Sequence, residues 1–247
     1  MKNISIKSQL VIYLFLFVFY LFIVGKGAMF LLTTLLATAS AIAIDSVFTY
    51  IRSKKLLLTE SSVISGLIIG YVLASDNPWW VFVAAAFIAI CSKHLIRFKG
   101  KHLFNPAAIG IFLSTVLLQA QTQWKGTYLW YIVVPVGLYF IWKIRKLEVL
   151  YGYAVTSFVL FGMQMLTQHA PLSNIFGIFS YFYIFVMLIE PKTTPIKPLG
   201  KTIFGVGVAA VIFVLTQAGA TFDVELAGLL ALNLCVPFLN KIPEVKH

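Results

Sequence analysis

The strongest chemical signal in the sequence is a cationic stretch that leads into an apolar run. Lysine, arginine and histidine gather between Lys93 and His102, and the apolar run then begins at Asn105. Asparagine is a favoured N-cap and proline a favoured first helical residue, so a helix is predicted to start at Pro106. Helix N-termini attract anions, and the neighbouring cations would add to that attraction. The stretch therefore indicates a site for an anionic or strongly hydrogen-bonding ligand, and an ordinary cytoplasmic loop is the alternative explanation of its charge.

Asp45 is the acid that lies well inside an apolar run. A carboxylate within a membrane segment is by default a functional candidate, here for an ion pathway. Pairing with Arg52 or with a neighbouring helix is the structural alternative. Two other acids lie at predicted cytoplasmic helix ends and could each pair with a cation of the stretch: Glu60 and Glu190, with Lys93 or Lys101 as partners.

Other familiar chemistries are not indicated. His94 and His102 have no carboxylate between them, and His247 ends the chain, so no metal site is predicted. Neither a Walker nor a Rossmann phosphate loop occurs, so NAD(P)H or quinol chemistry would have to come from a partner. Cys91 and Cys235 lie in apolar surroundings without ligand spacing, which favours buried small hydrophobic residues. No hydrolytic constellation stands out.

The composition predicts an integral membrane protein. Of 247 residues, 60% are hydrophobic and 11% charged, and the mean hydropathy is +0.94. This balance leaves too little polar surface for a water-soluble globule. The uncharged run 8–25 is too long for a signal-peptide core and is kept as a membrane span.

Ten apolar runs are predicted to cross the bilayer. With the N-terminus in the cytoplasm, all but two of the 19 Lys and Arg residues fall on the inside, the exceptions being Lys26 and Lys125. The prediction is a bacterial cytoplasmic membrane protein with both termini, including Lys2 and Lys246, in the cytoplasm. The net charge of +11 then reflects topology and requires no nucleic-acid partner. The runs are 8–25, 28–51, 58–75, 78–95, 104–119, 127–145, 148–168, 172–190, 201–217 and 222–240.

Ten spans divide into two fives, which predicts inverted five-helix repeats over 1–125 and 126–247 within one all-α, polytopic membrane domain. Two runs are short for a span, from Ser61 and from Asn105, and serine at 61 and 62 is expected to cap the first. The segment 190–195 breaks the chain in the second half, and the last run contains Asn233 and Pro237. Broken helices point to a central site.

Several of these elements resemble the NqrB/RnfD family, the membrane subunits of the sodium-translocating NADH:quinone reductase and of the Rnf electron transport complex. The resemblance implies a urea-transporter-like fold of ten helices in inverted repeats that holds flavins in the membrane and passes electrons across it. It rests on Ser65-Gly66-Leu67, Lys93-His94, Gly100-Lys101 with Phe104-Asn105-Pro106-Ala107, Glu190-Pro191 with Thr193-Thr194-Pro195, and Asn233-Leu234-Cys235-Val236-Pro237.

A flavin needs an apolar or aromatic slot for its ring, polar donors for its pyrimidine edge, and hydroxyl or cationic partners for its tail. Tyr71, Trp79 and Trp80 could line the slot, although each is also explained as a residue of the aromatic interface belt. The residues expected to bind the cofactor, riboflavin or FMN, are Ser62, Ser65, Gly66, Lys93, His94, Lys101, Asn105, Pro106, Thr193 and Thr194.

One departure from the family concerns covalent FMN. Family members carry an extracytoplasmic Ser-Gly-Ala-Thr-type sequence whose threonine bonds FMN, and this chain has none between Leu118 and Pro191. The tetrad that ends at Thr221 follows a different helix and has alanine in place of the expected serine, so a glycine-containing helix end is the competing interpretation. The expected flavin is therefore noncovalent, with Thr221 as the possible attachment site.

Two functions remain open. The first is a flavin-binding electron-transfer protein in the membrane, alone or docked to a reductase or other redox subunits. The second is a channel or transporter of the same fold, for flavin or another small solute, without redox activity.

Overall fold

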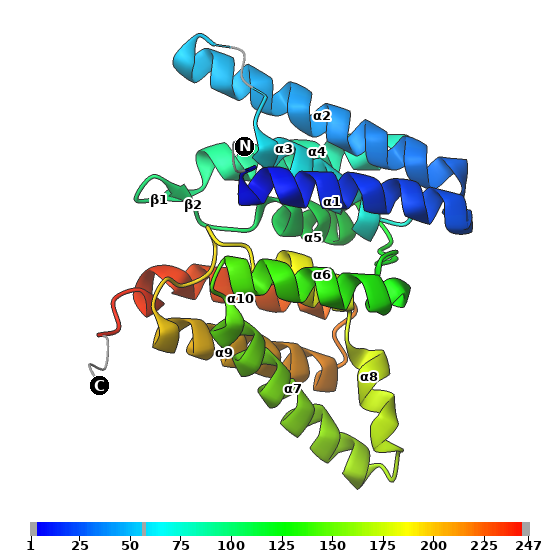
Figure 1. Ribbon diagram of the computed structural model, residues 1–247, viewed down its shortest axis with the longest axis vertical. Coiled ribbons are helices and arrows are strands. Elements are labelled where there is room, and N and C mark those ends of the chain that lie inside the picture. Colours follow the sequence, from blue (N-terminus) through cyan, green and yellow to red (C-terminus); the bar gives the residue numbers. More distant parts are fainter. Residues whose placement is uncertain (1–3, 56–57, 244–247) are drawn as a thin grey trace. The chain divides into compact units, whose positions relative to one another are not determined.

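The computed structural model describes residues 4–55 and 58–243, and helices account for most of them (Figure 1). The first part of the chain contains α1 (Ile6–Leu21), the π-helical turn η1 (Phe22–Lys26), α2 (Gly27–Ser53), α3 (Glu60–Val72), α4 (Trp79–Leu95), a hairpin of β1 (Arg97–Phe98) and β2 (Lys101–His102), and α5 (Pro106–Leu118). The second contains the 3₁₀ turn η2 (Thr127–Leu129), α6 (Trp130–Lys143), α7 (Leu147–Thr167), the 3₁₀ turn η3 (Leu172–Asn174), α8 (Ile175–Ile178), the π-helical turn η4 (Tyr183–Met187), α9 (Pro198–Gln217) and α10 (Val224–Leu239).

Four helical segments of the described chain are long and apolar enough to cross a membrane: Ile6–Gly25, Gly27–Ser53, Leu147–Thr167 and Pro198–Gln217. Shorter apolar helices are Glu60–Val72, Trp79–Leu95, Pro106–Leu118 and Val224–Leu239. The chain is therefore a multi-pass, helical membrane protein. That ten segments cross, and in which direction, stays a prediction, and its terminal cations Lys2 and Lys246 lie outside the described residues.

The chain forms two compact units, which we call unit 1 and unit 2. Unit 1 contains residues 1–97 and 106–126, and unit 2 contains 98–105 and 127–247. The main division lies one residue from the boundary predicted between the repeats. The short segment 98–105, however, joins the second unit, and the chain returns to unit 1 at Pro106.

Unit 1 is built around α2 and α4. Helix α2 contacts α3 and α4, α4 also contacts α5, and α1 lies on α3. Small residues allow this packing: a Cβ atom added to Gly66 of α3 would lie 2.4 Å from the Cα atom of Thr38 on α2. Only glycine permits such a close approach of two helix backbones. The glycine that the sequence assigned to cofactor binding thus serves helix packing.

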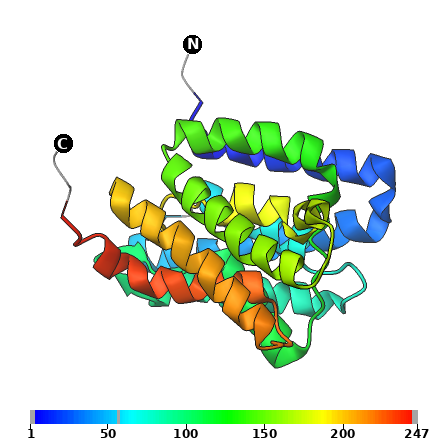
Figure 2. The ribbon, with the colours of Figure 1, turned by 90° about the horizontal axis from the view of Figure 1, so that it is seen from below.

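Unit 2 is built around α7 and α9. These two helices contact each other, α9 also contacts α10, and α6 contacts η4; Figure 2 shows α9 in orange beside α10 in red. The contacts follow the pattern of unit 1, with α7, α9 and α10 in the places of α2, α4 and α5. A repeated arrangement would require such a pattern. That the two repeats are inverted stays a prediction.

The run 172–190 is not the continuous helix that the sequence predicted. It is divided into η3, α8 and η4, with Phe179 in an extended conformation (φ −79°, ψ 121°). The Ser180 hydroxyl accepts a hydrogen bond from the backbone N–H of Tyr183 at 3.4 Å and so starts a new turn. A serine that caps the following turn competes with continuation of the helix. The last run behaves oppositely, because α10 continues through Asn233 and Pro237.

The two short helices of unit 1 have the lengths that the sequence predicted. Helices α3 and α5 contain 13 residues each, which at 1.5 Å per residue is about 20 Å. Helix α5 starts at Pro106 as predicted. The cap of α3 was predicted wrongly: Thr59, rather than the serine pair at 61 and 62, accepts from the backbone N–H of Ser62.

Candidate functional site

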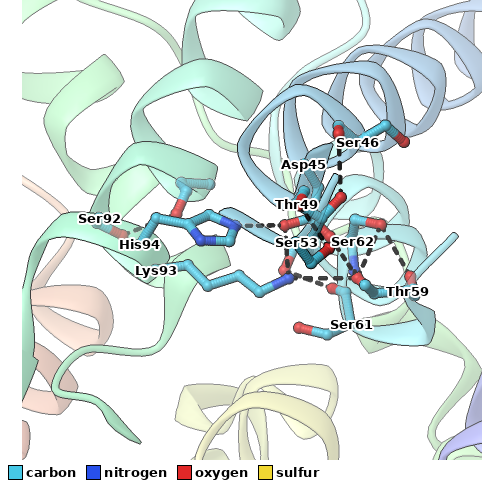
Figure 3. Close-up of polar contacts among 12 residues, drawn as sticks. Asp45, Ser46, Thr49, Ser53, Thr59, Ser61, Ser62, Ser92, Lys93 and His94 are labelled. Atoms are coloured by element: carbon cyan, nitrogen blue, oxygen red, sulfur yellow. Dashed lines mark hydrogen bonds and ion pairs between the residues drawn. The ribbon is translucent and has the colours of Figure 1, made fainter. Parts of the chain in front are cut away.

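The residues singled out in the sequence fall into two polar clusters, one in each unit. The first, which we call the Asp45 cluster, contains Asp45, Thr59, Lys93 and His94. Asp45 comes from the C-terminal half of α2, Thr59 caps α3, and the two cations end α4. Figure 3 shows the Lys93 and His94 side chains reaching toward Asp45.

Three donors converge on the Asp45 carboxylate. The Lys93 ammonium lies 2.8 Å and the His94 Nε2 atom 2.7 Å from Oδ1, and the Thr59 hydroxyl lies 2.5 Å from Oδ2. The Asp45 side chain is 1% exposed, against 12% for Lys93 and 14% for His94. A carboxylate this deeply buried is stable only when it is paired and hydrogen-bonded, and both conditions hold here.

Aromatic packing fixes the imidazole. The His94 ring stacks on Phe48 of α2 with a centroid separation of 4.7 Å and an interplanar angle of 5°. Because Phe48 lies on the helix that carries Asp45, the stack and the hydrogen bond both hold the ring against α2. The orientation of His94 is therefore determined by two contacts.

The partners of the acids differ from those predicted. Asp45 pairs with α4 rather than with Arg52, and Lys93 is therefore bonded to Asp45 rather than to Glu60 or Glu190. Glu60 instead accepts hydrogen bonds from the hydroxyls of Ser5 and Ser8. Spacing along one chain indicates charge but not which helix faces it, and the packing of α4 on α2 decides the pair.

Ser62 and Ser65 are buried beside the Asp45 cluster and bond to their own helix turn. The Ser62 hydroxyl donates to the Thr59 carbonyl at 2.8 Å, and the Ser65 hydroxyl donates to the Ser61 carbonyl at 2.9 Å. Local bonds of this kind satisfy hydroxyls within an apolar helix bundle. Both serines would have to give up or share these bonds to contact a ligand.

The second cluster, the Asn233 cluster, joins residues of unit 2 that are far apart in the sequence. The Asn105 backbone N–H donates to Asn233 Oδ1 at 2.9 Å, and Asn233 Nδ2 donates to the Thr193 carbonyl at 3.0 Å. The Asn105 side chain donates to the Met187 carbonyl at 3.3 Å. Asn233 on α10 is fully buried and thus bridges the residue before α5 and the irregular segment after η4.

An acid and a histidine complete this cluster. His102 Nε2 lies 3.1 Å from Glu190 Oε1, and the Thr193 hydroxyl donates to Glu190 Oε2 at 3.2 Å. The Thr194 hydroxyl donates to the Glu190 carbonyl at 2.9 Å. Glu190 therefore pairs with His102, whereas the sequence assigned it to Lys93 or Lys101.

The remaining predicted residues lie outside these networks. Lys101 is exposed on β2, and Pro106 is buried as the first residue of α5. Thr221 is exposed in the turn that precedes α10. Among the described residues no three His, Cys, Asp or Glu side chains form a metal-binding group, and His247 lies outside them.

Three buried lysines were not singled out by the sequence. Lys125, predicted as an outside loop cation, is 1% exposed and donates to the Gly70 carbonyl at 3.1 Å and to the Leu73 carbonyl, at the C-terminal end of α3. Cations stabilise helix C-termini. In unit 2, Lys146 donates to the Pro195 carbonyl and Lys201 to the Arg145 carbonyl, both at 2.7 Å. A lysine in a cytoplasmic loop is explained by topology alone, so only the fold reveals these bonds.

Burial leaves one of these lysines with altered acidity. Lys146 lies between α6 and α7, is 5% exposed, and has a pKa lowered to about 8, first by burial and then by the nearby charge of Lys201. Its ammonium holds the segment that contains Pro195 against the start of α7. The irregular segment 190–197 is thus fixed at two points, Glu190 and Pro195.

Comparison with known proteins places these motifs in one family. The model of the NQR2, RnfD, RnfE family matches residues 2–131 and again residues 132–246. The RnfD subunit of the ion-translocating oxidoreductase complex of Rhodobacter capsulatus is 39% identical over 80 residues, which is 32% of this chain and 20% of the relative. The corresponding subunit of Shewanella piezotolerans is 31% identical over 112 residues, or 43% of this chain and 31% of the relative.

The same subunit of Erwinia tasmaniensis is 28% identical over 113 residues, which is 44% of this chain and 30% of the relative. The chain thus spans less than a third of the length of each of these relatives. The family model, in contrast, covers nearly all of the chain in two successive matches. On that match, the chain belongs to the NQR2, RnfD, RnfE family.

Proposed function

We propose that this chain is a flavin-binding electron-transfer subunit of the bacterial cytoplasmic membrane. It would hold riboflavin or FMN noncovalently and pass electrons across the membrane, docked to a reductase or other redox subunits. The observation that carries the proposal is the Asn233 cluster, in which two elements shared with the family, Asn105-Pro106 and Thr193-Thr194, meet at one buried asparagine.

The backbone around this cluster supports a binding role. Residues 188–197 form no regular helix between η4 and α9. Irregular backbone is tolerated at membrane depth only where protein buries it or where it lines a cavity. Carbonyl, hydroxyl and amide groups gather there, and these are the groups that the pyrimidine edge of a flavin requires. A bound flavin would exchange some of the internal bonds of the cluster for bonds to its own ring.

The redox chemistry itself would come from the cofactor. A flavin accepts and returns electrons, while the protein supplies its position and the polar groups around it. Because the sequence has no phosphate loop of the Walker or Rossmann type, we assign NAD(P)H oxidation to a partner. The relatives named above are subunits of ion-translocating complexes, so this chain would also act with partner subunits and near a coupled ion.

The visible spectrum of the chain, purified in mild detergent, tests this proposal. We expect the absorbance of oxidised flavin, released from the chain on denaturing precipitation. Asn105→Ala should lower the flavin content at unchanged yield of folded protein, whereas Asn174→Ala, at an exposed position of η3, should leave it unchanged. Equal flavin content in both variants would remove Asn105 from the site.

The same measurement decides between noncovalent and covalent attachment. Flavin that stays with the precipitated chain would show a modified hydroxyl, and loss of that signal in Thr221→Ala would identify Thr221. Exposure of Thr221 in a turn favours neither the ring nor the tail of a buried flavin, so we place the cofactor elsewhere.

A transporter of flavin or another small solute is the second candidate. It is favoured by the pairing of Lys93 with Asp45, which neutralises a cation that a flavin phosphate would otherwise meet. A colourless preparation that raises solute uptake into proteoliposomes would establish this function and refute the first.

A further inference from the structure

The Asp45 cluster combines groups that the electron-transfer proposal does not use. It lies within unit 1, inside one of the segments long enough to span a membrane, about two turns from the end of α2. Its members are a buried carboxylate, an ammonium, an imidazole and a hydroxyl, all linked through the two carboxylate oxygens (Figure 3).

The donors in this cluster determine where a proton can reside. Asp45 receives three hydrogen bonds, one of them from an ammonium, and such bonds favour the ionised carboxylate. An ionised carboxylate only accepts hydrogen bonds, so the His94 Nε2 atom must carry the hydrogen that faces Oδ1. The second ring nitrogen, Nδ1, is then the atom at which a proton can be added or removed.

The same donors oppose a metal cation. Hard cations such as Na⁺ bind through oxygen atoms. Here Oδ1 is shared by two N–H donors at 2.7 and 2.8 Å, and one of them belongs to a full positive charge. A cation at Oδ1 would have to displace the ammonium or lie beside it. The other carboxylate oxygen already accepts the Thr59 hydroxyl.

The surroundings allow the imidazole to change charge. The His94 side chain is partly exposed, so a proton can reach it, and its ring stacks on the face of Phe48. Aromatic faces attract cations. From α4 the cluster is faced by Lys93 as well as His94, and from α3 by the neutral Thr59, while the neighbouring acid Glu60 is bonded to Ser5 and Ser8. Arg52 lies further along α2, in its last turn.

We propose that the Asp45 cluster is a proton-binding site that excludes Na⁺, in which the proton is taken up at Nδ1 of His94. Uptake converts the neutral imidazole to imidazolium and changes the net charge of Asp45, Lys93 and His94 from zero to +1. The Nε2–H bond to Asp45 remains in both states, so the ring need not turn. If the proposed electron-transfer function holds, this site would supply a proton close to electrons that cross the membrane.

Histidine NMR of the full chain in detergent, with isotope-labelled histidine, tests the site. One signal should disappear in His94→Gln, in which the amide can still donate to Asp45 but cannot bind a proton. That signal should move with pH between about 5 and 8, the range in which imidazole changes charge. The matched control His169→Gln, at an exposed turn position, should remove a different signal and leave this one in place.

Replacing choline by Na⁺ at constant ionic strength, near 0.1 M, tests the exclusion of the metal. We expect the proton affinity of the His94 signal to change by less than about twofold, which is about 0.4 kcal/mol. A signal that does not move with pH, or a tenfold loss of proton affinity in Na⁺, would overturn the proposal.

A second measurement needs no variant that might fail to fold. The thermal unfolding midpoint of the unmodified chain should be the same in NaCl and in choline chloride at pH 8. A stabilisation specific to Na⁺ that also lowers proton uptake at His94 would place the metal in the site and refute the proposal. Neither measurement requires flavin, so failure here leaves the electron-transfer proposal standing, and a colourless protein leaves this one standing.

Discussion

Removal of the Lys93 ammonium should reveal how strongly the Asp45 cluster holds α2 to α4. In Lys93→Met the methylene stem is largely kept, and the charge 2.8 Å from Asp45 Oδ1 is lost. Asp45 is then left 1% exposed with two hydrogen bonds, from His94 and Thr59. A buried charge that loses its counterion is destabilising unless another cation replaces it.

The magnitude follows from the geometry. At 2.8 Å and an effective dielectric constant near 20, the attraction is about 6 kcal/mol, and breaking one side of a buried pair costs about 3–5 kcal/mol in practice. Because Lys93 keeps 12% exposure and His94 remains, we expect the lower end, about 3 kcal/mol at pH 8. This corresponds to a fall of about 6–12 °C in the unfolding midpoint for a chain of this size.

The pH dependence of the same variant is diagnostic. Below about pH 6 imidazolium would replace the lost ammonium beside Asp45. The folded variant then binds more protons than the unfolded chain, so this stabilisation is present at low pH and is lost as pH rises. We expect the destabilisation of Lys93→Met to shrink to about 1–2 kcal/mol at pH 6, as a partner cation is restored.

Tryptophan fluorescence during heating in detergent measures these midpoints. Lys7→Met, at an exposed position of α1, is the matched control and should change little at either pH. The double variant Asp45→Asn/Lys93→Met removes both charges and should be more stable than Lys93→Met alone. Additive losses in the double variant, or a loss in Lys93→Met that is equal at pH 6 and pH 8, would refute this account of the cluster.

Three further predictions concern other parts of the two units. Asn233→Ala leaves two buried backbone groups without their partners and should cost about 3 kcal/mol; an unchanged midpoint would mean that the cluster is not formed. Gly66→Ala places a methyl group 2.4 Å from a backbone atom of α2 and should cost about 1–3 kcal/mol, whereas Gly177→Ala, with nothing within 4 Å of its added Cβ, should be nearly neutral. Because the pKa of Lys146 is lowered to about 8 in the folded chain, the unfolded chain binds more protons above that pH, and stability should rise from about pH 8 to 10 by up to about 1.4 kcal/mol per pH unit. Lys146→Met should flatten this rise, and a flat profile in the unmodified chain would contradict the lowered pKa.

The helices were predictable where apolar length and local caps decide the outcome. Helix α5 begins at Pro106 and is short, as the asparagine-proline pair and the length of the run indicate. The run 172–190 could not be interpreted in this way, because its hydropathy is continuous while the break at Phe179 depends on the Ser180 hydroxyl and on the packing of η4 against α6. Hydropathy reports the environment of a segment, whereas breaks within it depend on hydrogen bonds to side chains.

The members of the candidate sites were predictable in kind but not in pairing. Sequence reasoning identified Asp45, Lys93 and His94 separately, since an acid in an apolar run and a cationic stretch are both unusual in a membrane chain. It did not predict that they form one cluster, because they are almost 50 residues apart and their contact depends on the packing of α2 on α4. Asn233 appeared in the sequence only as a weak family signal, and its two long-range bonds explain why a polar residue lies within α10.

The asparagine-proline pair shows how a residue predicted to bind a ligand can also have a structural task. Asn105 belongs to unit 2 through its bonds to Asn233 and Met187, while Pro106 starts a helix of unit 1. The peptide bond between them is therefore the point at which the chain passes from one unit to the other. Proline keeps the preceding residue out of the helical conformation, which leaves the Asn105 N–H free of the helix ladder and able to bond to Asn233. A change at Asn105 would consequently alter both the anchoring of the chain and the polar cluster, so its effect on flavin content must be judged beside the yield of folded protein.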